Sequence, residues 1–191
     1  VVTGGASTIR GFVINRFGRH GVVLRSDGNQ LSDSVIGAGP DGKCAPPCAL
    51  GNRGSGVWIE GSGNVVGNGS LANLTRGGPF PEAPQNTISF NGDDGVTVKS
   101  GTRNNVGGNV LVGNGDLAID LGGDGLDKND KNDADSGPNE RMNSPVVLAA
   151  NKVGNKTDNP ISGFILNSGA LYRGKPNAEL RAFVRERLAE T

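Results

Sequence analysis

The sequence predicts an all-β fold, a right-handed parallel β-helix of about four coils followed by a short C-terminal appendage. Three observations predict it: few large apolar residues, a repeated frame of turns and short strands, and asparagines at equivalent turns. Of the 191 residues, 33 are glycine, 34% are hydrophobic and only 4% are aromatic. Because Gly, Asn and Asp tolerate tight turns, such a chain builds a slender core from short stacked strands.

Four segments share one frame, in which turn residues and a small residue precede an alternating apolar run. Aligned on Val22, Val57, Val96 and Ile119, they read GRHGVVLRSDG, NRGSGVWIEGSGN, NGDDGVTVKSGTRN and NGDLAIDLGGDG, with spacings of 35, 39 and 23 residues. Each run is too short for an amphipathic helix and suits a strand. Equivalent residues that recur in this way would stack on one another, as in a solenoid whose units are not stable alone.

Alternation within these runs predicts which side chains form the core. The first and third residues of each run should point inward and the middle residue outward. We expect the inward set to be Val22, Leu24, Val57, Ile59, Val96, Val98, Ile119 and Leu121. We expect the outward set to be Val23, Trp58, Thr97 and Asp120.

The turns before these strands carry asparagine at equivalent places. Asn52, Asn91 and Asn114 are expected to stack as a ladder, in which each amide bonds its copy in the next coil. A second set of short β-branched runs, TIRGFVINRF, NVVGNGSL, NTISFNGDDG and NVLVGNGD, ends in Asn or Gly and supplies further strands. A β-sandwich with many hairpins is the alternative fold, but sandwich strands rarely repeat in sequence.

Charge and hydropathy limit the partners. Lys+Arg and Asp+Glu balance at 19 each, whereas a protein that binds nucleic acid or an anionic membrane usually has a basic face. No run approaches the roughly 20 apolar residues of a membrane span. We therefore expect neither nucleic acid nor membrane insertion. No basic n-region followed by an apolar h-region opens the chain, so we expect any export signal to have been removed or never to have been cloned. The opening VVTGG indicates a chain cut from a longer protein.

The two cysteines, Cys44 and Cys48, lie together in KCAPPCALG. We expect a small disulfide loop that ties down a protruding turn, with a free thiol pair and half of a metal site as alternatives. A zinc site would need further Cys or His ligands, and His20 is the only histidine. A disulfide would imply an oxidising compartment.

Several segments resemble one family of proteins: STIRGFVINRFGRHGVVL, ALGNRGSGVWIEGSGN, NTISFNGDDGVTV and NVLVGNGDLAIDLGGDGLDKNDKNDADSGPNERMNSPVVL. They are similar to the bacterial right-handed parallel β-helix repeat proteins of the pectin-lyase-like superfamily, large surface or secreted polypeptides that often bear an N-terminal CSLREA motif. The resemblance covers residues 5–150, and its last segment is the most distinctive. It implies the fold, a secreted or cell-surface location and a following β-sandwich module, but no activity.

We expect residues 1–150 to form the β-helix and 151–191 the appendage. In the tail NAELRAFVRERLAET, apolar residues at i, i+3 and i+4 after an Asn177 cap favour a helix, which would cover the open end of a solenoid. The family resemblance instead suggests partial sandwich strands over 161–184. Both alternatives remain open.

The motif DDGVTVKSG, residues 93–101, also resembles a segment of the polygalacturonases, in which one aspartate protonates the leaving oxygen while others activate water. Asp93, Asp94 and Lys99 are therefore candidate catalytic residues. Other parts of that site are missing, since residues 64–74 hold no carboxylate and no histidine follows residue 102. A turn accepts Asp readily, so we expect a structural turn, with catalysis and cation binding as alternatives.

The segment DLGGDGLDKNDKNDADSGPN, residues 120–139, is the densest acidic stretch. Carboxylate and amide oxygens on a Gly-rich backbone suit Ca²⁺, although Pro138 stands where an EF-hand has Gly. We expect a structural Ca²⁺ that fixes the passage to the following module, or else a solvated acidic turn. The candidate ligands are Asp124, Asp127, Asp130, Asp133 and Asp135.

Two side chains have a structural and a functional interpretation. His20, in GRHG, is expected to be a solvated turn residue without a partner rather than a catalytic one. Trp58 is expected to pack under the insertion 70–85, or to form a platform for a sugar ring. We expect a non-enzymatic scaffold or adhesion segment of a secreted or cell-surface protein, with a polysaccharide or surface glycan as partner. A polyuronate hydrolase or lyase is the alternative.

Overall fold

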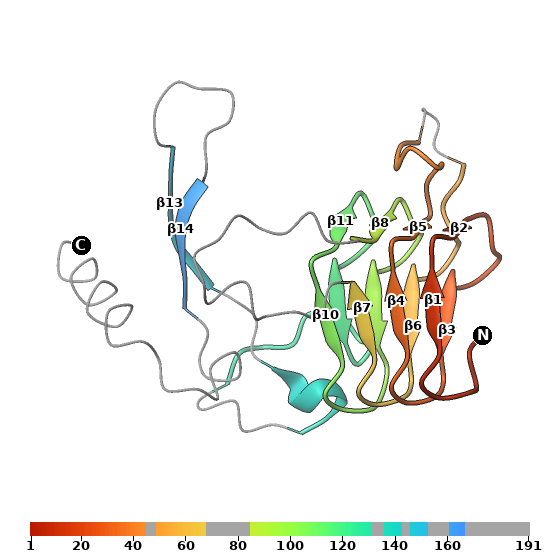
Figure 1. The fold of residues 1–191 in the computed structure, drawn as a ribbon. Coiled ribbons are helices and arrows are strands. Elements are labelled where there is room, and N and C mark those ends of the chain that lie inside the picture. The colour runs from red at the N-terminus through yellow and green to blue at the C-terminus, as the bar shows by residue number, and fades with distance from the viewer. Residues whose placement is uncertain (45–48, 68–84, 131–135, 143–145, 153–160, 167–191) are drawn as a thin grey trace, which may run out of the picture. The chain divides into compact units, whose positions relative to one another are not determined.

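The computed structural model describes residues 1–44, 49–67, 85–130, 136–142, 146–152 and 161–166 (Figure 1). Twelve short strands form three parallel sheets of four strands each. Their chain order gives four coils, β1–β3, β4–β6, β7–β9 and β10–β12, each with one strand in every sheet. The fold is a right-handed parallel β-helix of four coils, so the predicted fold class is confirmed.

Each sheet stacks its strands in chain order (Figure 1). Sheet 1 consists of β1 (Thr8–Arg10), β4 (Gln30–Ser32), β7 (Val65–Gly67) and β10 (Asn105–Gly107). Sheet 2 consists of β2 (Val13–Ile14), β5 (Val35–Ile36), β8 (Thr87–Ser89) and β11 (Val110–Val112). Sheet 3 consists of β3 (Val22–Leu24), β6 (Val57–Ile59), β9 (Val96–Val98) and β12 (Ile119–Leu121).

Sheet 3 has the register that the repeated frame predicts. Val22 pairs with Val57, Val57 with Val96, and Val96 with Ile119. The second set of runs divides between the other two sheets, since β7 belongs to sheet 1 while β8 and β11 belong to sheet 2. The unequal spacing of the repeats in the sequence therefore comes from corners of different length, whereas the strands keep their register.

A narrow apolar core runs along the axis of the coils. Its fully buried side chains come from every sheet, and they are Leu24, Leu31, Ile36, Val57, Ile59, Val66, Ile88, Val96 and Val98. Val22 is buried as predicted, but Ile119 is 40% exposed and Leu121 is only half-buried. Leu121 still packs against the core, and both residues pair in register with buried residues of β9. They are less buried than expected because β12 is an edge strand of sheet 3, with a neighbouring strand on one side only.

The middle residues of the sheet 3 strands differ in exposure. Val23 and Trp58 are half-buried, whereas Thr97 and Asp120 are buried. Thr97 and Asp120 are therefore buried although the alternation within their strands places them outward. The cause is the chain that follows β12: a Cβ built on Gly123 would lie 3.1 Å from the Thr97 methyl group.

Asparagine side chains join the coils at the corners. Asn52 donates from Nδ2 to Asn91 Oδ1 at 2.8 Å, and Asn91 donates to Asn114 Oδ1 at 3.0 Å. The backbone N–H groups of Asn52 and Asn91 donate to the same oxygens. The predicted ladder is confirmed, and we call it ladder A.

A second corner carries a longer ladder, which we call ladder B. Asn29 donates to Asn64 Oδ1 at 2.9 Å, and Asn64 donates to Asn104 Oδ1 at 3.1 Å. The backbone N–H of Asn104 then donates to Asn139 Oδ1 at 2.9 Å. Asn139 lies in a short 3₁₀ segment, η2 (Pro138–Arg141), and has a left-handed backbone with φ of 49°.

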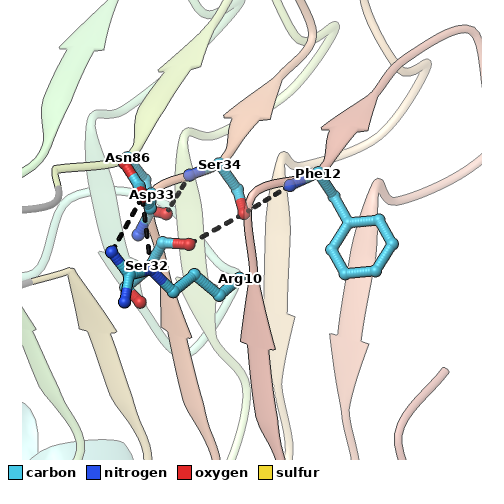
Figure 2. A network of polar contacts seen from close by, with 6 residues as sticks. All are labelled: Arg10, Phe12, Ser32, Asp33, Ser34 and Asn86. Atoms are coloured by element: carbon cyan, nitrogen blue, oxygen red, sulfur yellow. Dashed lines mark hydrogen bonds and ion pairs between the residues drawn. The ribbon is translucent and has the colours of Figure 1, made fainter.

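The third corner has a mixed ladder that starts from serine (Figure 2). The backbone N–H of Phe12 donates to Ser34 Oγ, and the backbone N–H of Ser34 donates to Asn86 Oδ1. Asn86 continues to Asn109 Oδ1 at 2.9 Å. Every corner of the solenoid thus pairs backbone donors with side-chain acceptors of the next coil.

Ladder B shows where the acidic segment is inserted. Residues 25–28, 60–63 and 99–103 connect the first three sheet 3 strands to the next ladder B asparagine. After β12, residues 122–138 make the same connection to Asn139. In the chain, the acidic segment is therefore an insertion between β12 and the last asparagine of ladder B.

The chain divides into two compact units, residues 1–126 with 136–140 and residues 127–135 with 141–191. The second unit contains an antiparallel pair, β13 (Val146–Lys152) and β14 (Ile161–Leu166). The predicted boundary at residue 150 falls within β13, and the division into 1–150 and 151–191 stays a prediction. The tail for which a helix was expected lies outside the described residues. Among the described residues, no helix is long and apolar enough to cross a membrane.

Substitution of a ladder asparagine is expected to destabilise the solenoid. Asn104 Oδ1 accepts from both the backbone N–H and Nδ2 of Asn64, so Asn104→Ala leaves two buried donors unpaired. We expect a loss of about 2–6 kcal/mol, since each of the two buried donors left without a partner costs about 1–3 kcal/mol. Urea unfolding measures the loss.

The adjacent residue provides a matched control. Asn105 is half-buried, and its side chain makes no hydrogen bond within the described part of the chain. Asn105→Ala should therefore change the free energy of unfolding by less than about 0.5 kcal/mol. Equal losses in the two variants would contradict a stabilising role for the ladder.

Candidate functional site

One corner gathers ionisable and hydroxyl side chains from successive coils. It is the corner of ladder A, which leads from sheet 2 into sheet 3. In coil 1, Phe17 takes the place of the ladder A asparagine, because its backbone N–H donates to Asn52 Oδ1. The residues three positions after Phe17 and after each ladder A asparagine form a set that we call the corner column: His20, Ser55, Asp94 and Leu117. The glycine after Ser55 allows close stacking, because a Cβ on Gly56 would lie 2.4 Å from an Ile88 methyl group.

Side chains of the corner column bind the backbone of the next coil. His20 Nδ1 accepts a hydrogen bond from the backbone N–H of Ser55 at 3.1 Å. Asp94 Oδ1 accepts one from the backbone N–H of Leu117, also at 3.1 Å. A histidine in coil 1 and an aspartate in coil 3 thus make the same kind of bond.

Asp94 is bound into the fold through its other oxygen as well. The Thr97 hydroxyl donates to Asp94 Oδ2 at 2.6 Å, and Thr97 Oγ1 lies 2.7 Å from Ser55 Oγ. The residue is only 3% exposed. Both carboxylate oxygens are therefore occupied by bonds that hold the corner together.

Two further carboxylates lie beside Asp94. Asp93 is half-buried and accepts a hydrogen bond from Ser55 Oγ at 3.3 Å, while Asp116 is exposed. One oxygen of each of Asp93, Asp94 and Asp116 lies within 4.8 Å of the others. Sequence reasoning missed Asp116, although it stands two residues after Asn114, as Asp93 stands after Asn91. Acidic corners of this kind are common in proteins without a ligand, so the cluster alone assigns no cation.

The environment of Asp94 favours its protonated form. Burial raises the pKa of the Asp94 carboxyl above its ordinary value, and the charges of Asp120 and Asp93 raise it further. Hydrogen bonds from Thr97 and from the backbone of Leu117 act in the opposite direction. The net effect on this pKa is upward.

The chain beyond β12 crosses the outer face of sheet 3. Asp120 holds it there, because Oδ1 accepts from the backbone N–H of Gly123 and Oδ2 from that of Gly125, both at 2.9 Å. Lys99 Nζ donates to the carbonyl oxygen of Gly122 at 2.7 Å. Of the three candidate catalytic residues, Asp93 and Asp94 therefore lie together, while the Lys99 ammonium group binds this crossing segment.

His20 has partners, so the expectation of a solvated residue without them is wrong. Its ring stacks on Trp58, with centroids 4.4 Å apart and an interplanar angle of 27°. Trp58 Nε1 donates to Glu60 Oε1 at 3.0 Å, and Glu60 pairs with Arg25. The insertion under which Trp58 was expected to pack lies almost entirely outside the described residues.

Burial of the ring lowers the pKa of His20. The Arg19 guanidinium lowers this pKa further, whereas Asp93 and Glu60 act to raise it. The imidazole is thus kept neutral to lower pH than an ordinary histidine. Its neutral form is the one that accepts a hydrogen bond at Nδ1.

The expected calcium ligands are described only in part. Asp127 pairs with Arg141, whereas Asp133 and Asp135 lie outside the described residues. Within the described ranges, Asp124, Asp127 and Asp130 do not form a compact group of three carboxylates. The loop site stays a prediction. Cys44 takes part in a disulfide, and Cys48, its expected partner, also lies outside the described residues.

Asp94→Asn should change how stability depends on pH. Because the folded state raises the pKa of Asp94, its contribution is fully present below the ordinary value of 3.8 and is lost as pH rises through the raised pKa. The free energy of unfolding, relative to wild type, should therefore rise over this window in Asp94→Asn. Urea unfolding at a series of pH values measures the difference.

Asp93→Asn is the control for this experiment. It removes a charge that raises the pKa of Asp94, so the decline in stability should persist and move to lower pH. A pH profile of Asp94→Asn that runs parallel to wild type would show that Asp94 does not titrate as inferred.

Comparison with protein-family models, with curated proteins and with solved structures finds no match to this chain. The resemblance to the β-helix repeat proteins therefore stays a prediction, and the fold and the contacts of the corner column carry the functional argument.

Proposed function

We propose that this chain is a non-enzymatic scaffold or adhesion segment of a secreted or cell-surface protein. One observation carries the proposal: both oxygens of the buried Asp94 carboxylate accept hydrogen bonds that hold the corner together. The residue most suited by its raised pKa to act as a general acid is thereby committed to the fold.

The positions of the carboxylates also argue against glycoside hydrolysis. An inverting enzyme keeps its two carboxyl groups about 6.5–9.5 Å apart, to leave room for water beside the sugar. Here the oxygens of Asp93, Asp94 and Asp116 approach within 4.8 Å. A retaining enzyme tolerates closer carboxyls but needs a nucleophile that reaches the sugar, and Asp94 is only 3% exposed.

A polyuronate hydrolase or lyase is the second candidate. It is favoured by the convergence of Asp93 and Asp94 from coil 3 with Asp116 from coil 4. A carboxyl with a raised pKa beside other carboxylates is also a feature of acid–base sites. This candidate requires the corner to open so that Asp94 can reach a substrate.

The extracytoplasmic setting and the ligands belong to the same proposal. The disulfide of Cys44 supports an oxidising compartment. Regular faces of stacked strands support a polysaccharide or surface glycan as the partner, and the Asp- and Asn-rich sequence of residues 120–139 supports a structural Ca²⁺.

Enzyme assays and binding assays together test the proposal. Reducing sugars and unsaturated products would be measured over a panel of polyuronates, with and without Ca²⁺, for wild type and Asp94→Asn. We expect no turnover. Binding would be followed by co-sedimentation with insoluble polysaccharides and by the fluorescence of Trp58, the only tryptophan. We expect binding that survives in Asp94→Asn.

Two results would favour the second candidate. The first is turnover by wild type that disappears in Asp94→Asn while the variant remains folded. The second is the release of soluble products from a polysaccharide that the protein binds. Absence of binding to every polysaccharide in the panel would remove glycan adhesion and leave a scaffold alone.

A further inference from the structure

His20 occupies a place where a side chain ties one coil to the next. Its Nδ1 accepts the backbone N–H of Ser55 in coil 2 at 3.1 Å. The same place in coil 3 is taken by Asp94, which accepts the backbone N–H of Leu117 in coil 4. The sequence therefore uses this position twice for an acceptor that bridges neighbouring coils.

The two acceptors respond differently to acid. A protonated carboxyl group still has oxygen lone pairs that accept a hydrogen bond. A protonated imidazole has none, because both ring nitrogens then carry hydrogen. Acidification would place the Nδ1–H of His20 against the N–H of Ser55. Protonation therefore abolishes the hydrogen bond between His20 and Ser55, whereas the bond between Asp94 and Leu117 can persist.

The ring has little room to adjust without moving as a whole. It stacks on Trp58 at 4.4 Å, and a Cβ built on Gly54 would lie 2.8 Å from His20 Nδ1. The charged groups that act on it are Arg19 from its own turn, Asp93 from the turn in coil 3, and Glu60 beyond the end of β6. A protonated ring would therefore be repelled by Arg19 and attracted by the two carboxylates.

We propose that His20 is an acid-sensitive latch, closed between coils 1 and 2 when the ring is neutral and opened by its protonation. Opening removes the Ser55 bond and the stack on Trp58 together, because one ring makes both contacts. The backbone bonds from Gly54 to Arg19 and from Gly21 to Ser55 remain. The change is therefore local to the corner and does not unfold coil 1.

Because the latch requires the neutral ring of His20, its contribution to stability is lost at low pH. The folded state lowers the pKa of His20 below its ordinary value of 6.5. The stability that the latch contributes is therefore complete above pH 6.5 and is lost as pH falls through the lowered pKa. This inference concerns the joining of coils and does not depend on the proposed function.

The chain has one histidine and one tryptophan, so each gives an unambiguous signal. Nitrogen-15 NMR of the imidazole should show the tautomer with hydrogen on Nε2 at neutral pH and a pKa below 6.5. Fluorescence of Trp58 should show one transition with the same midpoint. The tautomer with hydrogen on Nδ1, or a pKa above 6.5, would overturn the proposal.

Variants separate the latch from other titrating groups. His20→Asn places an amide oxygen near the Nδ1 position, so it retains the acceptor and does not titrate. Between pH 7 and 5, the melting temperature of wild type should fall by about 2–4 °C more than that of His20→Asn, the shift expected when a single contact is lost. The fluorescence transition should be absent from His20→Asn. Parallel profiles for the two proteins would overturn the proposal.

Glu60 is the control for the fluorescence signal, because its carboxylate accepts the hydrogen bond from Trp58 Nε1. Glu60→Gln retains an acceptor there and removes the charge. A transition that persists in Glu60→Gln, with its midpoint moved to lower pH, supports the latch, because Glu60 raises the pKa of His20. A transition that persists in His20→Asn and disappears in Glu60→Gln would assign the signal to Glu60 and overturn the proposal.

Discussion

Backbone N–H groups at the corners of a solenoid have no strand partner, yet neighbouring coils bury them. A buried backbone amide must be paired, so each corner needs a hydrogen-bond acceptor from the next coil at a fixed position. Asparagine meets this need in both directions, because Oδ1 accepts from the coil below while Nδ2 donates onward. Asn64 and Asn91 are fully or almost fully buried and do this in ladders B and A. The apolar core can remain narrow because the corners are held by polar bonds.

The same constraint explains how much could be predicted from the sequence. The sheet 3 register follows from like residues aligned on Val57 and Val96, and ladder A from asparagines at equal distances before them. Ladder B was missed although Asn29, Asn64 and Asn104 follow Val22, Val57 and Val96 by 7, 7 and 8 residues. Only its last member, Asn139, follows an insertion that hides the repeat. The burial of Thr97 and Asp120 was missed for another reason. Their burial depends on the segment after β12, which crosses the outer face of sheet 3. The alternation of residues within a strand does not predict such a crossing.

The corner column has the residue types of a catalytic site, although its side chains serve to join neighbouring coils. Asp94, Ser55 and His20 are residue types of hydrolytic enzymes, and they lie at one corner on successive coils. The hydrogen bonds of His20 and Asp94, however, go to the backbone of the next coil, and the Ser55 hydroxyl binds Thr97 and Asp93. The DD motif could be found from the sequence, but its role depends on what each oxygen contacts. Thr97 lies three residues from Asp94, whereas the contacts with Leu117 and Ser55 come from neighbouring coils, 23 and 38 residues away.

The insertion after β12 shows that a long sequence can separate a strand from the next ladder asparagine. Coil stacking constrains the strands and the ladder asparagines, whereas the length between them is free, because loop closure costs rise only slowly with length. The chain leaves sheet 3, is held at Gly123 and Gly125 by Asp120, and returns at Asn139 to accept the N–H of Asn104. Seventeen residues (122–138) thus replace four or five without a break in ladder B. A new loop chemistry can therefore be added at a corner of this solenoid while the hydrogen bonds that define its coils stay in place.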